Sequence, residues 1–123
     1  MKLYVLWLSM CYIRIVIYYL NYDIKKAKIM RVKNINGTSQ HTCKCGSWIQ
    51  HWRNYSGQIA TECRAAGCSR KDLVGAHVQK DVSYDSSWYI VPFCNMHNQS
   101  KQKVELVANT VLVSANVATT CGR

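Results

Sequence analysis

The N-terminal part of the chain is apolar almost without interruption. From residue 3 to residue 20 nearly every position is aliphatic or aromatic, with Arg14 near the middle. A run of this length is close to the minimum for a membrane-spanning helix, but a central arginine opposes insertion by about 2.5–3.5 kcal/mol. Residues 1–29 can therefore be a membrane anchor, a dispensable extension ahead of a natural start at Met30, or a helix packed on the body.

The hydrophobic pattern after Gly46 has the period of an α-helix. Three aromatic side chains and a histidine recur at i, i+3, i+4 and i+7, which places them on one helical face: Trp48, His51, Trp52 and Tyr55. Ser47 is a suitable N-cap, and Ser56-Gly57 is a suitable end. The pattern predicts a helix that runs to about Tyr55 and packs both tryptophans into the core.

Two apolar segments further along the chain have the pattern of a β-hairpin. Residues 73–78 and 88–91 are mostly apolar, and the polar residues 81–87 connect them. We therefore predict two antiparallel strands joined by a long loop. Proline suits the first turn of a helix, where its missing N–H would be unsatisfied anyway. Pro92 and Phe93 are thus predicted to open a short helix directly after the second strand.

The remaining segments of the body are short. Residues 34–39 are rich in turn formers and predict an irregular lead-in. Residues 104–107 and 110–113 alternate between apolar and polar, which predicts two strands with a turn at 108–109 or one bent strand. We expect residues 30–123 to form one small α+β domain that follows the apolar extension.

Four potential metal ligands frame the predicted hairpin. Cys63 and Cys68 precede it, and Cys94 and His97 follow it. Two close pairs of cysteine and histidine, separated by a longer stretch, are the usual arrangement of a tetrahedral Zn²⁺ site. Such a site would join the loop before the hairpin to the helix after it. A small domain with a modest core commonly needs a bond of this kind.

A second set of potential ligands surrounds the predicted helix. Cys43 and Cys45 form a Cys-x-Cys-Gly knuckle, and His51 is on the helix that follows. Cys121 is the one body cysteine that remains, and we predict it as the fourth ligand of a second zinc site. The alternative for His51 is a buried, hydrogen-bonded histidine of the core.

Cysteine usage also bears on the redox compartment. Seven cysteines in a short chain can form disulfides or bind metal. The count is odd, histidines stand at ligand spacing, and a disulfide between Cys43 and Cys45 would close a very tight loop. These features favour zinc over disulfides. Zinc-binding thiolates in turn favour a reducing, intracellular location, with membrane association if residues 3–20 insert.

The chain is strongly basic, with a formal net charge of +10. Residues 30–123 hold eleven basic and five acidic side chains, so the excess is not confined to the extension. This excess favours acidic partners, nucleic acid first, through phosphate attraction and counterion release. The alternative is that the charge only keeps a small protein soluble.

The segment from Cys63 to Lys103 resembles the HNH, or ββα-metal, nuclease family, especially its members braced by a structural zinc. The resemblance rests on Ala76-His77-Val78 and on Pro92-Phe93-Cys94-x2-His97-Asn98. It implies a treble-clef zinc motif and a role for His77 as the general base that activates water. It also implies that Asn98 holds a catalytic Mg²⁺ or another divalent ion, which stabilises the leaving oxygen.

The sequence departs from this family at two positions. Tyr89 stands where the family has the asparagine that orients the catalytic histidine, and Ala76 stands where a further metal ligand often lies. Two functions therefore compete: a metal-dependent endonuclease, and a non-catalytic zinc module that binds nucleic acid or a partner protein. In the second case His77 is a hydrogen-bonded strand histidine, and Asn98 is a polar residue on the helix surface.

Overall fold

The computed structural model describes residues 10–21, 29–38 and 40–122. Residues 10–21 form a helix whose large apolar side chains are exposed, Tyr12 to 70% and Ile17 to 50%. Among the helices of the described ranges, none has both the length and the apolar character needed to cross a membrane. Most of the rest of the predicted apolar extension lies outside the described residues, and its three interpretations stay predictions.

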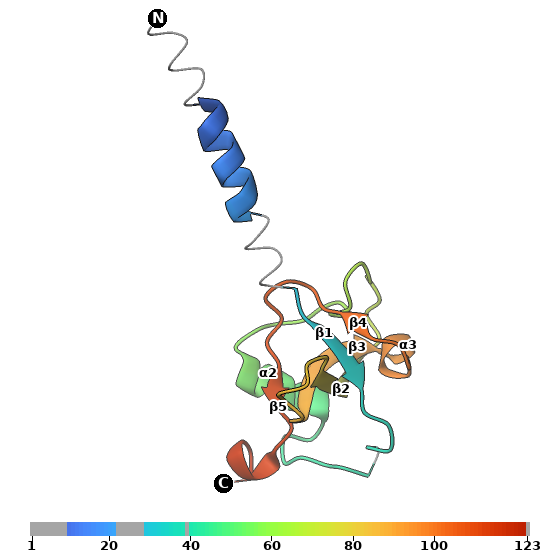
Figure 1. Ribbon diagram of the computed structural model, residues 1–123. Coiled ribbons are helices and arrows are strands. Elements are labelled where there is room, and N and C mark those ends of the chain that lie inside the picture. The colour runs from blue at the N-terminus through green and yellow to red at the C-terminus, as the bar shows by residue number, and fades with distance from the viewer. Residues whose placement is uncertain (1–9, 22–28, 39, 123) are drawn as a thin grey trace, which may run out of the picture.

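The body has α+β architecture, as the sequence predicts, and is built on a five-stranded antiparallel sheet of order β4-β1-β2-β3-β5 (Figure 1). Its strands are β1 (Arg31–Asn34), β2 (Leu73–Lys80), β3 (Tyr89–Cys94), β4 (Val104–Glu105) and β5 (Val113–Ser114). The helices of the body are α2 (Trp48–Ser56), α3 (Asn95–Asn98) and the 3₁₀ turn η1 (Val117–Thr119).

The predicted hairpin is present as β2 and β3. Its register runs from the pair Leu73 and Cys94 to the pair Val78 and Tyr89. The order of loop with two cysteines, hairpin and helix is also present, although the treble-clef assignment stays a prediction. Strand β2 extends to Lys80 because Gln79 and Lys80 pair with β1. Strand β3 begins one residue later than predicted and extends to Cys94, because its last three residues pair with the start of β2.

The helix after the second strand does not begin where we predicted. Pro92 and Phe93 belong to β3, and α3 begins at Asn95 with Cys94 as its N-cap. Proline is tolerated here because β5 pairs only with Tyr89 and Ile90, so β2 is the one strand neighbour of this stretch. The prediction that Pro92 opens the helix is therefore wrong, and Cys94 lies at the junction of strand and helix.

Strand β1 has no counterpart in the sequence prediction, which placed only an irregular lead-in after Met30. Val32 is the one fully buried residue of β1, and a single buried position gives no periodic signal. The strand is instead held by distant partners, because Val32 pairs with Lys80 on one side and with Val104 on the other. The chain becomes irregular only after Asn34.

The two C-terminal segments lie at opposite edges of the sheet. β4 pairs with β1, and β5 pairs with β3. The chain turns at residues 108–109 between them, where Asn109 has a left-handed backbone with φ of 65°. Two strands with a turn between them are present, but they are shorter than the predicted 104–107 and 110–113, and the single bent strand is wrong.

The two faces of the hairpin carry separate cores. Ala76 and Val78 pack with Phe93 on the side that we call the α3 face. Successive strand residues point to opposite faces, so Gly75 and His77 belong to the other side, the α2 face. There helix α2 packs on β2 and β3, and a second core forms, made of Trp52, Ile90, Ala60 and Val113.

Helix α2 matches its prediction closely. The Ser47 side chain accepts a hydrogen bond from the Gln50 backbone N–H at 3.1 Å, and Gly57 ends the helix with φ of 68°. Trp52 is fully buried, and its Nε1 donates to the Val111 carbonyl at 2.8 Å. The helix thus ties the C-terminal segment to the hairpin. Tyr55, at the end of the predicted face, is 45% exposed.

Candidate metal centres

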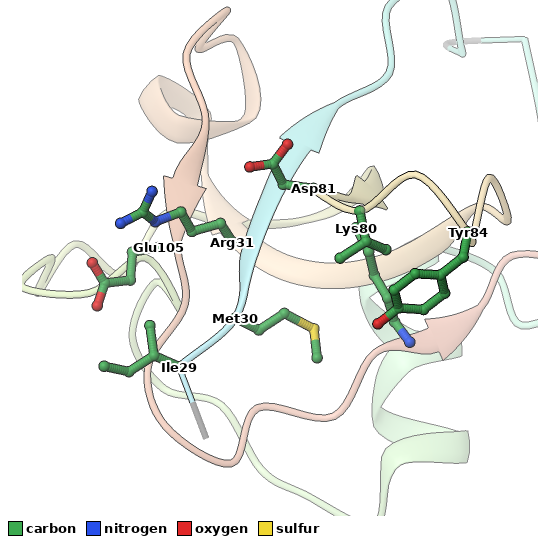
Figure 2. Close-up of a pocket in the computed structure, with 8 residues that line it drawn as sticks. Ile29, Met30, Arg31, Lys80, Asp81, Tyr84 and Glu105 are labelled. Atoms are coloured by element: carbon green, nitrogen blue, oxygen red, sulfur yellow. The ribbon is translucent and has the colours of Figure 1, made fainter. Parts of the chain in front are cut away.

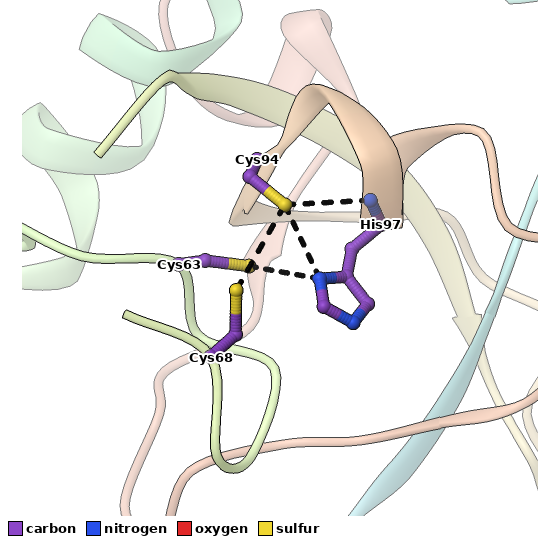
Figure 3. Close-up of side chains that lie close together, drawn as sticks. All are labelled: Cys63, Cys68, Cys94 and His97. Atoms are coloured by element: carbon purple, nitrogen blue, oxygen red, sulfur yellow. Dashed lines mark hydrogen bonds between the residues drawn. The ribbon is translucent and has the colours of Figure 1, made fainter. Parts of the chain in front are cut away.

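The first predicted ligand set comes together in space. The ligand atoms of Cys63, Cys68, Cys94 and His97 all lie within 4.8 Å of one another (Figure 3). His97 Nδ1 is 3.5 Å from the Cys63 sulfur and 3.2 Å from the Cys94 sulfur, and the Cys68 and Cys94 sulfurs are 4.0 Å apart. We call this set the first centre.

These distances suit a tetrahedral ion. With Zn–S near 2.3 Å and Zn–N near 2.0–2.1 Å, the edges of a tetrahedron are about 3.8 Å between two sulfurs and about 3.6 Å between sulfur and nitrogen. A disulfide would require the sulfurs to lie about 2.0 Å apart. All seven cysteines lie in the described ranges and are free thiols. The first centre could therefore hold a metal ion.

Local structure explains how the four side chains converge. Cys63 and Cys68 lie on a loop that is fixed to the sheet, since the Arg64 N–H donates to the Pro92 carbonyl at 2.9 Å. Cys94 ends β3, and its sulfur accepts the His97 backbone N–H at 3.4 Å. The carbonyl of His97 in turn accepts from the Asn34 side chain at 2.7 Å, which anchors α3 to β1.

The electrostatics of the first centre favour a bound cation. Cys63 is 2% exposed, and its burial raises the pKa of the thiol to about 12. Burial also acts to raise the pKa of Cys94, but hydrogen bonds, first that from the His97 N–H, outweigh it and lower this pKa. A buried thiolate beside other sulfurs is costly unless a positive charge lies next to it. A divalent ion would supply that charge.

The second ligand set also converges. Cys43, Cys45 and His51 place their ligand atoms within 4.8 Å of one another. His51 is fully buried, and its Nε2 lies 2.9 Å from the Ser114 carbonyl. A carbonyl can only accept, so Nε2 carries a proton, and in the neutral imidazole Nδ1 then has the free lone pair. This is the tautomer that a metal-binding histidine needs, and the bond that fixes it is typical of such sites.

Cys121 lies beside this set. Its sulfur is 3.6 Å from His51 Nδ1, the same distance as that of Cys45, and it accepts the Lys44 backbone N–H at 3.3 Å. We call Cys43, Cys45, His51 and Cys121 the second centre. His51 bonds to Ser114 through Nε2 while its Nδ1 faces the two sulfurs. It can therefore be both a buried, hydrogen-bonded core histidine and a ligand of the second centre.

Replacing Cys121 tests the membership of the second centre. In Cys121→Ser we expect bound zinc to fall from two equivalents to about one, because loss of a ligand should weaken the centre by more than the roughly 10–100-fold that an outer-shell change costs. Metal content of the purified protein measures this. Cys11→Ser, which changes a cysteine outside both centres, is the matched control. An unchanged two equivalents in Cys121→Ser would remove Cys121 from the set.

His77 is a buried histidine on the α2 face. It is 6% exposed, and its ring packs against Trp48 with 4.6 Å between the ring centroids. Burial, followed by the nearby His41 and His51, lowers the pKa of His77 to about 4. The imidazole is therefore neutral at pH 7. Among the hydrogen bonds of the described residues, none involves the His77 ring, so the predicted internal partner is not found there.

Asn98 lies on the other side of the sheet. Asn34 and Val78 are register partners, so their side chains share the α3 face. The Asn34 amide reaches the His97 and Ser100 carbonyls, which places the end of α3 on that face. His77 is the neighbour of Val78 in β2, so its side chain points to the opposite face of the sheet. The structure therefore does not bring the two predicted catalytic residues together.

Tyr89 also belongs to the α3 face. It pairs with Val78, and its hydroxyl donates to an Asp85 carboxylate oxygen at 2.6 Å. The Lys80 ammonium lies 3.4 Å from the same carboxylate. The residue at the family's orienting position is thus engaged by the loop after β2 and is turned away from His77.

A cavity of about 550 Å³ lies where β1 begins and β2 ends (Figure 2). Its charged lining residues have both signs, Arg31 and Lys80 against Asp81 and Glu105. Figure 2 shows the Met30 side chain extending between them. None of the predicted site residues lines this cavity, and its mixed charge favours no class of ligand.

Several groups around the centres gave no signal in the sequence. Ser114 acts through its carbonyl and Lys44 through its backbone N–H, and backbone groups are the same for every residue type.

Comparison with protein families, with curated proteins and with solved structures finds no match for this chain.

Proposed function

We propose that this protein is a zinc-stapled module that binds nucleic acid without cleaving it. The main observation in support is the spacing of the ligand atoms in the two centres, which agrees with the edges of a zinc tetrahedron. The first centre has four converging protein ligands, so a bound ion would be closed off, as in structural zinc sites. At the second centre three ligand atoms converge, and Cys121 beside them would be the fourth ligand that closes it. Catalytic zinc sites instead keep one position for water or substrate.

The charge of the body supports nucleic acid as the partner. Ion pairs engage Asp72, Asp81 and Asp85 with Arg70, Lys103 and Lys80. Within the described residues, seven basic side chains of the body have no such partner: Arg31, Lys33, Lys44, Arg53, Arg64, Lys71 and Lys101. The positive excess is thus not cancelled internally. The HNH resemblance points to the same class of partner.

The placement of His77 and Asn98 argues against cleavage by this pair. A general base and the metal that stabilises the leaving oxygen must reach the same phosphodiester. Here the two residues are on opposite faces of one sheet. The proposal therefore follows the non-catalytic alternative.

Binding and cleavage can be tested on one preparation. We expect the zinc-loaded full-length chain to retard DNA or RNA, with affinity falling about 40–500-fold between 50 and 200 mM salt if three to five phosphates are contacted. Supercoiled plasmid should stay intact with Mg²⁺ or Mn²⁺. Gel retardation over a salt series and plasmid nicking measure the two properties.

Matched variants separate the alternatives. Lys33→Ala should lower the salt slope by about 1, whereas Lys103→Ala, whose side chain pairs with Asp81, should change it less. Nicking that disappears in both His77→Ala and Asn98→Ala would restore the endonuclease and overturn the non-catalytic proposal. Absence of any retardation at low salt would move a protein partner ahead of nucleic acid.

A further inference from the structure

Four rings meet on the α2 face outside the two ligand sets. His77 of β2 lies against Trp48 of α2, and Trp88, just before β3, lies against His41 with 5.3 Å between centroids. The two pairs are adjacent, since the centroid of the His77 ring is 6.2 Å from the ring centroids of both His41 and Trp88. Trp48 Nε1 donates to the His41 carbonyl at 3.0 Å, which holds His41 in place. We call His41, Trp48, His77 and Trp88 the aromatic cluster.

His77 is the unusual member of the cluster. It is more than nine-tenths buried, yet its ring has no hydrogen-bond partner within the described residues. Among the described residues, the fully buried side-chain atoms without a partner do not include the His77 ring nitrogens, so these nitrogens remain open to a partner from outside. A ligand that brings its own hydrogen-bonding edge to the cluster would provide that partner.

The cluster has an accessible side. Trp88 is 37% exposed, and His41 is exposed as well. Trp88 also lines a cavity of about 340 Å³ together with Ser87, Ser114, Ala115 and Asn116. This volume is within the range of small-molecule sites, roughly 300–1,000 Å³. A flat ligand of modest size can therefore reach the ring of Trp88.

The surrounding charge selects the class of ligand. Lys33 is exposed on β1 and pairs with Gln79, which shares the α2 face with His77. Lys44 is exposed three residues after His41. Asp85, the acid nearest in sequence to Trp88, is already bound by Tyr89 and Lys80 on the α3 face. A flat ring attached to a negative backbone suits these surroundings better than a cation does.

We infer that the aromatic cluster binds an unpaired nucleobase of a single-stranded nucleic acid. The base stacks on the exposed ring of Trp88, with the ring of His41 edge-on beside it, and one of the edges of the base pairs with the imidazole of His77. Base–aromatic stacking of this kind needs a free base face, which a duplex covers. This inference rests on the proposed nucleic-acid binding and adds a preference for single strands to it.

The experiment compares a labelled single-stranded oligonucleotide with its duplex. Binding is measured by fluorescence polarisation to the zinc-loaded full-length chain and to three variants. Trp88→Ala removes the stacking surface, and Trp88→Phe keeps part of it. His77→Phe keeps a ring of similar size without the hydrogen-bonding edge. Tyr84→Ala is the matched control, because Tyr84 is an aromatic residue 86% exposed and outside the cluster. Zinc content establishes that each variant is folded.

We expect the wild-type chain to prefer the single strand. Trp88→Ala should weaken single-strand binding by about 5–140-fold, the range for loss of one stacked base, and should leave duplex binding nearly unchanged. Trp88→Phe should recover much of the loss, His77→Phe should lower the affinity, and Tyr84→Ala should not.

The failures of the two proposals can be told apart. If single-strand and duplex binding are equal and survive Trp88→Ala, the nucleic-acid proposal stands and the base site is overturned. If an equal loss of both occurs in folded Trp88→Ala, the tryptophan serves general affinity and the base site is likewise overturned. If neither nucleic acid binds at low salt, both proposals fail together.

Discussion

Removal of zinc is expected to unfold the body of this protein. Structural zinc contributes about 10–16 kcal/mol of binding free energy in small finger-like domains at neutral pH, and whole domains are stable by only about 5–15 kcal/mol. At the first centre the ion would join the loop of Cys63 and Cys68 to the strand–helix junction of Cys94 and His97. Without it, buried sulfurs and a histidine would face each other with no compensating charge.

The measurement is thermal melting under reducing conditions, with and without a strong chelator. We expect residues 58–103 to lose their cooperative transition in excess chelator and their amide protons to exchange rapidly. Added Zn²⁺ should restore both properties, whereas added Mg²⁺ should not, because Mg²⁺ prefers oxygen ligands. A cooperative transition that persists at the same Tm in excess chelator would show that the fold does not depend on the ion.

Variants can assign this dependence to a centre. Cys68→Ser should reproduce the effect of chelation on the first centre, and Cys11→Ser should not, since Cys11 lies on the separate helix of residues 10–21. Cys121→Ser should affect the second centre alone. If Cys68→Ser and Cys121→Ser had identical melting curves, the two centres would not be independent structural units.

Gly75→Ala is expected to be among the most destabilising single substitutions in the hairpin. A Cβ at this position would lie 2.3 Å from the Trp48 backbone carbon and 2.5 Å from the Ile49 nitrogen. Both atoms belong to the first turn of α2, so they cannot move away as the tip of a flexible side chain can. We expect a loss near the upper end of overpacking costs, about 3 kcal/mol, and a Tm lowered by more than about 10 °C.

Gly75→Ala should also weaken zinc binding at the second centre. Displacing the start of α2 moves His51, whose Nδ1 lies 3.6 Å from two sulfurs. We therefore expect Gly75→Ala to bind its second zinc more weakly while the first centre, on the other face, stays loaded. Gly57→Ala is the control, because Gly57 has open space around it and a φ of 68°. It should cost only the left-handed strain of about 1–2 kcal/mol and should leave both centres intact. Normal zinc content in Gly75→Ala would mean that α2 adapts without moving His51.

The sequence was a good guide to the elements that local chemistry defines. The bounds of α2 follow from the Ser47 cap, the aromatic period and Gly57, all within one short segment. The hairpin follows from two apolar segments joined by a polar connection. Pro92 misled the prediction because proline is favourable at a helix start and also tolerated where a strand has one strand neighbour. The choice between these depends on the position of β5, which is distant in the sequence.

The ligand sets were also visible in the sequence, but to different degrees. The first centre consists of two close pairs on either side of a hairpin, and the pairing of the strands necessarily brings the pairs together. Cys121 had no such local argument, since it is far along the chain from Cys45. Its approach to His51 depends on β5 and the segment after it, where Ser114 bonds to the same histidine.

By itself, then, the sequence determined which side chains could bind metal, where one helix begins and ends, and that the body is basic, because spacing, capping and charge are properties of neighbouring residues. Only the tertiary structure decided the place of β1, the approach of Cys121, and the separation of His77 from Asn98. Strand pairing and helix packing between distant segments set which face of the sheet each residue occupies. The spacing of residues along the chain does not predict that face.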